Sequence, residues 1–169
     1  MERIRLSFKY TQGEYVKAER QYLFASKAIT KTSVVVLALY LLLSLVYFFL
    51  SSFTVLSSIF LGIALFAFVA GCTVYFYMPV YKFKQTSKYH EEYNLTFSLE
   101  KIEFKTPTID SELKWDVYSD FWESNDFYFL IQAKRIYTLV PKRAFRNLAT
   151  KQTFENIVLS NLKCTKRIL

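Results

Sequence analysis

The main feature of the hydrophobic pattern is one long block without charge. No Asp, Glu, Lys, Arg or His occurs from Thr32 to Tyr81, and the 22 basic and 14 acidic residues all lie outside these positions. A soluble amphipathic helix keeps a polar face, so it would not produce such a block. Because roughly 20 apolar residues cross a bilayer, the block predicts two transmembrane helices joined by a short turn.

The turn is predicted at the only polar cluster inside the block, "SSFTVLSS" at 51–58. The first span then covers about 33–50 and the second about 55–78. Pro79 follows, where a helix can end without losing a needed hydrogen bond. Since 31 patterned and charged residues precede the block, we expect a retained anchor rather than a cleaved signal peptide.

The residues that flank the block predict its orientation. The connecting turn carries no charge, whereas lysines stand on both outer flanks, at Lys27, Lys31, Lys82, Lys84 and Lys88. The positive-inside rule therefore predicts a multi-pass protein of the inner (plasma) membrane with both termini in the cytoplasm. In that reducing compartment we expect no disulfide between Cys72 and Cys164.

Before the block, residues 1–31 change from strand to helix periodicity. Apolar Ile4, Leu6 and Phe8 alternate with polar neighbours, which is typical of a half-buried strand. Thr11 and Glu14 have the spacing of a capping box and predict a helix start. The apolar face of that helix would be Tyr15, Ala18, Tyr22, Ala25 and Ile29. A lone strand is unstable, so we expect residues 3–10 to join a sheet formed after the block.

After the block, residues 82–169 predict a small α+β domain. Short alternating runs favour strands near 93–99, 102–104, 113–117, 127–133 and 136–140. An amphipathic helix with Phe154, Ile157, Val158 and Leu162 follows, and Thr150 is its expected N-cap. The predicted fold is a membrane helical hairpin plus a cytoplasmic bent antiparallel sheet, or partial barrel, closed by the C-terminal helix.

The sequence contains no motif for catalysis, and we predict no catalytic, cofactor-binding or metal-binding residue. The single histidine, His90, has no clustered ligands, and no nucleophile stands in a known motif. No small-molecule substrate is indicated. The carboxylates of the acidic segment favour a solvated or salt-bridging edge; they are Asp116, Asp120, Glu123 and Asp126.

The basic charge is concentrated at the membrane flanks and near the C-terminus, which favours membrane lipids over nucleic acid as a partner. Residues 91–126 are acidic, whereas residues 134–169 are basic. These halves either pair within the folded domain or turn a basic face to the anionic leaflet, at about 1 kcal/mol per basic residue near the surface. Lys142, Arg143 and Arg146 are the candidate lipid or partner contacts.

The order of parts resembles a known family. The chain resembles the YcxB-like family of bacterial membrane proteins in six successive parts. These parts are "SFKYTQGEYVKA", a two-span hairpin, "KIEFKT", "SELKWDVYSDFWESNDFYFLI", "YTLVPKRAF" and a final helix. The most specific pieces are Trp115, Glu123, "DFYFLI" and "VPKRAF" at 140–145. The resemblance implies a pleckstrin-homology-like cytoplasmic domain and provides no catalytic residue.

Together these observations predict a non-enzymatic integral membrane protein with parts at 1–31, 32–81 and 82–169. Its cytoplasmic module would bind a protein partner or inner-leaflet lipid. In the alternative, it is an accessory or regulatory subunit of a larger membrane complex, such as a transporter or a stress-response assembly, recruited through the hairpin. Small residues between Gly62 and Gly71 would also permit homo-oligomer packing.

Overall fold

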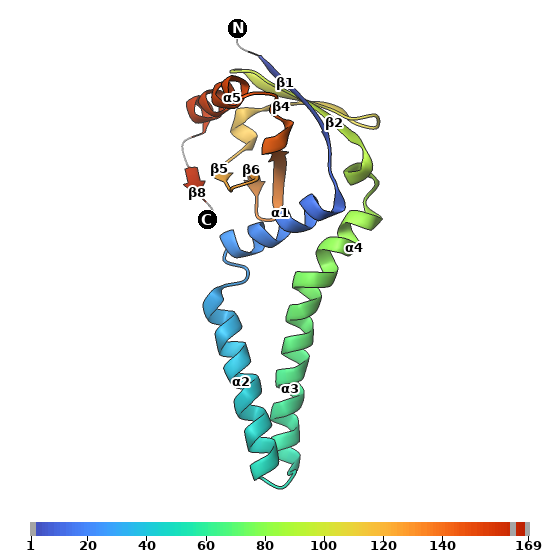
Figure 1. Cartoon of the computed structure of the whole chain (residues 1–169), viewed down its shortest axis with the longest axis vertical. Coiled ribbons are helices and arrows are strands. Elements are labelled where there is room, and N and C mark those ends of the chain that lie inside the picture. The colour runs from blue at the N-terminus through green and yellow to red at the C-terminus, as the bar shows by residue number, and fades with distance from the viewer. Residues whose placement is uncertain (1–2, 163–164, 168–169) are drawn as a thin grey trace. The chain divides into compact units, whose positions relative to one another are not determined.

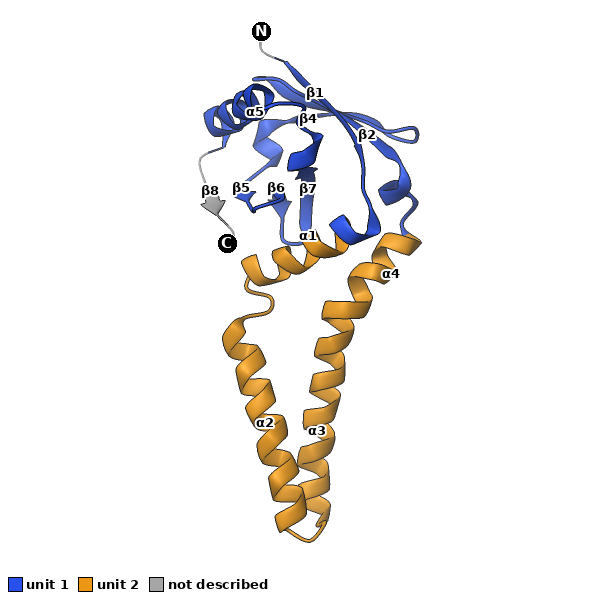
Figure 2. Ribbon diagram, viewed as in Figure 1, with its two compact units in different colours: residues 1–14, 86–169 blue, residues 15–85 orange. Residues whose placement is uncertain are grey.

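The computed structural model describes residues 3–162 and 165–167 (Figure 1). The chain divides into two compact units, shown in Figure 2. Unit 1 combines Met1–Glu14 with Thr86–Leu169, and unit 2 is Tyr15–Gln85. Hydrophobicity alone divides the chain at 31 and 81, whereas tertiary contacts place the N-terminal strand with the C-terminal domain. Cys72 is a free thiol, and Cys164 lies outside the described residues.

The first sheet of unit 1, sheet A, includes the predicted N-terminal strand. Its antiparallel order is β1 (Ile4–Lys9), β2 (Glu92–Phe97), β3 (Lys101–Lys105) and β4 (Asp110–Lys114). Leu6 of β1 stands opposite Leu95 of β2, and both side chains are buried. Buried and exposed positions alternate strictly along β1, as its sequence predicted. The expectation that this strand joins the later sheet is confirmed.

The second sheet, sheet B, has the order β7 (Ile136–Pro141), β6 (Phe127–Ala133), β5 (Asp120–Glu123) and β8 (Thr165–Arg167). Within the described ranges neither sheet closes into a barrel, which corrects the partial-barrel alternative. The sheets stay separate because the chain leaves sheet A at Trp115. The strand predicted at 113–117 is therefore wrong in its second half. β4 ends at Lys114, and a 3₁₀ turn, η3 (Trp115–Val117), leads the chain into the other sheet. The buried Trp115 indole donates to the Ser98 carbonyl at 2.9 Å, which fixes this turn.

The C-terminal helix, α5 (Leu148–Asn161), closes the core of unit 1. Phe154 is fully buried, and its ring lies 4.9 Å from that of Phe97 in sheet A and 5.2 Å from that of Tyr128 in sheet B. The helix begins earlier than predicted, because its N-cap is Asn147 rather than Thr150. The Asn147 side-chain oxygen accepts from the Thr150 amide at 2.8 Å, and this satisfies a donor of the first turn.

Unit 2 contains most of α1 (Gln12–Ala25), then α2 (Lys31–Leu50) and α3 (Val55–Cys72). The turn at 51–54 lies within the predicted cluster. Two short elements continue α3, a π-helix η1 (Thr73–Tyr77) and α4 (Met78–Gln85). The predicted apolar face of α1 is buried at Tyr15, Ala18, Tyr22 and Ala25, but the helix ends at Ala25, so the predicted fifth member, Ile29, lies outside it and is only half-buried.

The predicted helix end at Pro79 is wrong, because the helix continues to Gln85. A proline within a helix removes the hydrogen bond to the carbonyl four residues earlier and clashes with it. That carbonyl belongs to Tyr75, inside the wider π turn η1. The Arg20 Nε donates to the Tyr75 carbonyl oxygen at 3.3 Å, and its guanidinium lies 4.8 Å from the Tyr75 ring centroid. Arg20 therefore replaces the donor that proline lacks.

Candidate functional site

The predicted contact residue Lys142 lies in a short 3₁₀ turn, η4 (Lys142–Ala144), which follows β7. Its Nζ is 2.6 Å from a Glu123 carboxylate oxygen and 4.8 Å from the Tyr128 ring centroid. Only 18% of the Lys142 side chain is exposed. Two of the residues that support the family resemblance thus form one partly buried ion pair, and the expectation of a salt-bridging Glu123 is confirmed.

The neighbouring cation, Arg143, binds to residues at the start of α1 and just before it. Its guanidinium contacts both carboxylate oxygens of Glu14 and donates to the Lys9 carbonyl oxygen at 2.8 Å. These hydrogen bonds from Arg143, together with those from Thr11, lower the pKa of Glu14 from 4.5 to about 2. Glu14 also completes the predicted capping box, because its amide donates to the Thr11 hydroxyl. The pair therefore attaches the first turn of α1 to the η4 turn within unit 1.

Arg146, the third predicted contact, lies in the loop between η4 and α5 and is exposed. The structure thus separates the three cations: Lys142 and Arg143 form intramolecular ion pairs, and Arg146 faces solvent. Contact of these residues with lipid or a partner stays a prediction.

Two buried phenols of unit 1 serve as hydrogen-bond donors. Tyr10 donates to the Leu139 carbonyl, and Tyr128 donates to the Glu155 carboxylate. Burial is the main cause that raises the pKa of each phenol far above its ordinary value. Both groups therefore stay protonated at neutral pH, which suits a structural role and not that of a base.

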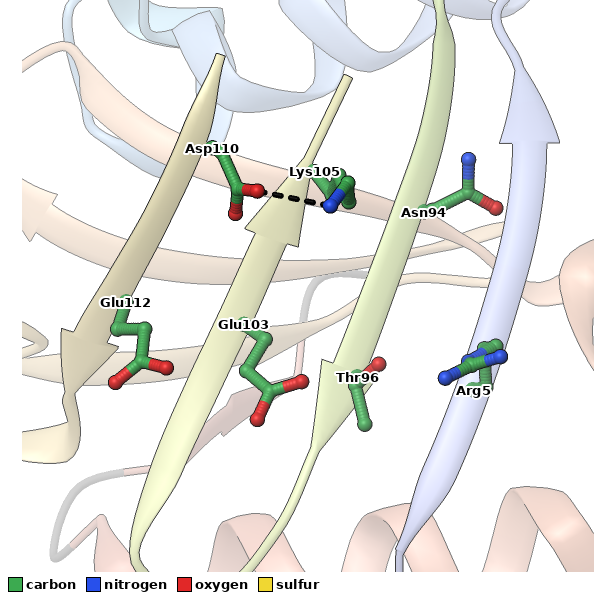
Figure 3. Close-up of a pocket in the computed structure, with 7 residues that line it drawn as sticks. All are labelled: Arg5, Asn94, Thr96, Glu103, Lys105, Asp110 and Glu112. Carbon is green, nitrogen blue, oxygen red and sulfur yellow. Dashed lines mark hydrogen bonds and ion pairs between the residues drawn. The ribbon is translucent and has the colours of Figure 1, made fainter. Parts of the chain in front are cut away.

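The outer face of sheet A carries a polar groove of about 380 Å³, drawn in Figure 3. Strand register arranges its lining in two rows. Arg5, Thr96, Glu103 and Glu112 face one another across the four strands, and Asn94, Lys105 and Asp110 form the second row. We call this surface the sheet A groove. The sequence shows the alternation that exposes these side chains, but only the pairing register places them in rows.

The groove separates positive and negative charge. Lys105 Nζ lies 2.8 Å from Asp110, and Lys101 Nζ lies 2.6 Å from Glu112 and 3.3 Å from Glu103. No ion pair within the described part of the chain involves Arg5. The β1 side therefore presents a cation without a counter-ion, and the β3–β4 side presents two carboxylates that share one lysine.

The remaining predicted acidic residues do not assemble into one site. Asp116 lies in η3, Asp120 begins β5 and Asp126 lies in the turn before β6. Over residues 3–162, no group of three or more His, Cys, Asp or Glu residues has the arrangement of a metal site. His90 ends a short 3₁₀ turn, η2 (Ser87–His90).

Two helical segments of unit 2 are long and apolar enough to cross a membrane, Lys31–Leu50 and Val55–Gln85. Their most apolar windows are only 6% and 11% buried. Large apolar side chains face outward along both, including Leu43, Leu50, Val55 and Phe66. Such exposure is unlike a soluble core helix, whose apolar side chains are covered by protein, and it indicates membrane association.

Part of unit 1 is similar to a known protein family. No curated protein and no solved structure matches the chain. A family model described as YcxB-like protein matches residues 97–158, from the end of β2 into α5. The match includes the ion-paired Glu123, Lys142 and Arg143, and it includes the β3–β4 side of the sheet A groove. The resemblance seen in the sequence is thus confirmed over residues 97–158, which match the YcxB-like family.

Proposed function

We propose that the protein is a non-enzymatic, two-span protein of the bacterial inner membrane whose YcxB-like domain binds a protein partner in the cytoplasm. The observation that carries the proposal is the outward-facing apolar surface of α2 and α3. Leu50, Val55 and Phe66 are each more than three-quarters exposed, at 79%, 78% and 77%. Removing one such side chain from water is worth roughly 1.5–3 kcal/mol, so a bilayer is the environment that these helices favour.

The orientation follows from the lysines on the outer flanks. Lys31 begins α2, Lys82 and Lys84 lie in the last turn of α4, and the turn between the spans has no charge. With positive flanks retained inside, both termini are cytoplasmic. The two four-stranded sheets and the closing helix α5 would then form a cytoplasmic module of the pleckstrin-homology-like kind.

The ion pairs of the η4 turn support a protein partner over lipid as the main ligand. A phosphate that approached Lys142 or Arg143 would compete with Glu123 or Glu14, which already neutralise these cations at short range. The sheet A groove presents charges of both signs, and a protein surface can complement both.

Topology is tested with reporter fusions in the full chain, one at Ser52 and one after the C-terminus. We expect a periplasm-active reporter to work only at Ser52 and a cytoplasm-active reporter only at the C-terminus. Activity of both fusions on the same side would refute the two-span arrangement.

Partner binding is tested by purifying the full chain from native membranes after cross-linking and identifying the co-purified proteins. A chimera that carries a foreign hairpin tells the two roles apart. Retention of the partner places recognition in unit 1, as proposed, whereas its loss from a folded chimera favours the subunit recruited through the hairpin. Recovery of phospholipid without any protein partner would contradict the proposal.

A further inference from the structure

We propose that the sheet A groove is the recognition site for an extended segment of the protein partner, in which an acidic side chain precedes or follows a basic one by three residues. This inference rests on the proposed function and adds to it the chemistry of the bound segment. The two rows of side chains in Figure 3 would contact this segment.

The β1 end of the groove selects an anion. Arg5 is exposed, and its neighbours across the strand pair, Thr96 and Asn94, are neutral. Because no acidic residue in the described part of the chain pairs with Arg5, its five donors are available to a carboxylate. A planar guanidinium can hold a carboxylate through two parallel hydrogen bonds, which gives direction as well as attraction.

The other end selects a cation. Glu103 and Glu112 stand directly opposite each other on β3 and β4. Like charges in facing positions destabilise a sheet, and Lys101 supplies one positive charge for the two carboxylates. Lys105 gives no further relief, because it is paired with Asp110. A basic side chain from a partner would neutralise the remaining negative charge.

The spacing of the strands sets the distance between the anion-binding end and the cation-binding end of the groove. Arg5 and Glu103 lie in the same row, two strands apart. Neighbouring strands are about 4.8 Å apart, so the two backbone positions are separated by roughly 10 Å. A polyproline II segment returns to the same side every three residues and advances about 9 Å in doing so. A segment that crosses the strands in this conformation therefore places an acid over Arg5 and a base over Glu103.

The mixed charge also explains why we favour a peptide over an anionic headgroup. A phosphate attracted to Arg5 would face the Glu103 and Glu112 carboxylates along the same row. An exposed groove of this kind gives modest affinity, because surface ion pairs are screened by water and salt. Selectivity between charge patterns is therefore the property to measure.

The test uses the full chain in nanodiscs of neutral lipid and three labelled, proline-rich peptides. One carries Asp and Lys three residues apart, one carries them adjacent, and one has Gln at both positions. Fluorescence anisotropy should show the spaced peptide binding about tenfold more tightly than the Gln peptide. We expect Arg5→Glu to abolish this preference and Glu103→Gln to reduce it. Arg3→Glu is the matched control, since it makes the same charge change just outside the groove and should leave binding unchanged.

Fluorescence of Trp115 and Trp122, both in unit 1, checks that each variant is folded. Equal binding of the three peptides, or an unchanged preference in a folded Arg5→Glu variant, would overturn the assignment of the groove. Co-purification from membranes separates this result from the proposed function. A partner retained by both wild type and Arg5→Glu leaves the proposed function standing and overturns only the groove as its site.

Discussion

The ion pair between Glu14 and Arg143 allows the contribution of one interaction to unit 1 to be measured. The perturbation is a double-mutant cycle built from Glu14→Gln, Arg143→Gln and the double variant. Arg143 and Thr11 together lower the pKa of Glu14 from 4.5 to about 2, which corresponds to ~3.4 kcal/mol at ~1.36 kcal/mol per pKa unit. Thr11 accounts for part of this energy, and 51% of the Arg143 side chain is exposed to solvent, which screens the pair, so we expect a coupling of ~1–1.5 kcal/mol.

The sign of the pH dependence follows from the lowered pKa of Glu14. Its contribution is fully present above pH 4.5 and is lost as the pH falls toward 2, where the folded state also binds the proton. The assay is urea unfolding of the full chain in detergent, followed by the fluorescence of the two tryptophans of unit 1. The coupling energy should be near its full value at pH 7 and clearly smaller at pH 2.

A second cycle, on Lys105 and Asp110, is the control. These side chains also form an ion pair at 2.8 Å, but they are 68% and 70% exposed. We expect no measurable coupling there. The reasoning about Glu14 and Arg143 would be refuted by a coupling energy within error of zero at pH 7, or by equal values at both pH values.

Three further predictions concern the core, the spans and the π turn. Phe154→Ala should lower the free energy of unfolding of unit 1 by ~3–5 kcal/mol in the same urea assay, because it empties the fully buried site between the sheets; a loss under ~1 kcal/mol would contradict this core. Leu43→Arg should raise the apparent free energy of membrane insertion by ~2.5–3.5 kcal/mol in a translocon assay, since this side chain is 65% exposed near the middle of α2; unchanged insertion would mean that it does not face lipid. Arg20→Met should cost ~1–3 kcal/mol of stability of unit 2, measured by thermal unfolding in detergent, because the Tyr75 carbonyl loses its donor; restoring a regular helix with Pro79→Ala in the same chain should recover part of that loss.

Most of the secondary structure follows from the local pattern of the sequence. At three positions the prediction was wrong, and at each of them one hydrogen bond made the difference. Thr150 is a good N-cap residue by type, yet Asn147 accepts from the Thr150 amide and so starts α5 three residues earlier. Trp115 continues the alternation of β4, yet its indole finds the Ser98 carbonyl and the chain turns. At Pro79 a donor from another helix replaces the missing one. At Trp115 and Pro79 a hydrogen bond to a residue far away in the sequence decided the outcome, and a local window does not show such partners. At α5 a nearby residue that also favours the N-cap position competed with Thr150.

For the candidate sites, too, the sequence showed the unusual residues but not their partners. The sequence identified Lys142 and Arg143 as unusual adjacent cations, but it could not show that Glu123 and Glu14 already neutralise them. Nor could it show the sheet A groove, whose lining comes from four strands that include Arg5 at one end of the chain and Glu112 more than a hundred residues later.

The sequence by itself determined the two apolar helices, their connecting turn, the strand and capping box before them and the family of residues 97–158. These properties depend on residues close together in the chain, through hydrophobic periodicity and local hydrogen bonds. The tertiary structure alone decided the strand and the register with which β1 pairs, which carbonyls and carboxylates the cations bind, and where opposite charges collect on the surface. Those properties depend on strand register and on pairs far apart in sequence, which are fixed only when the two sheets fold around Phe154.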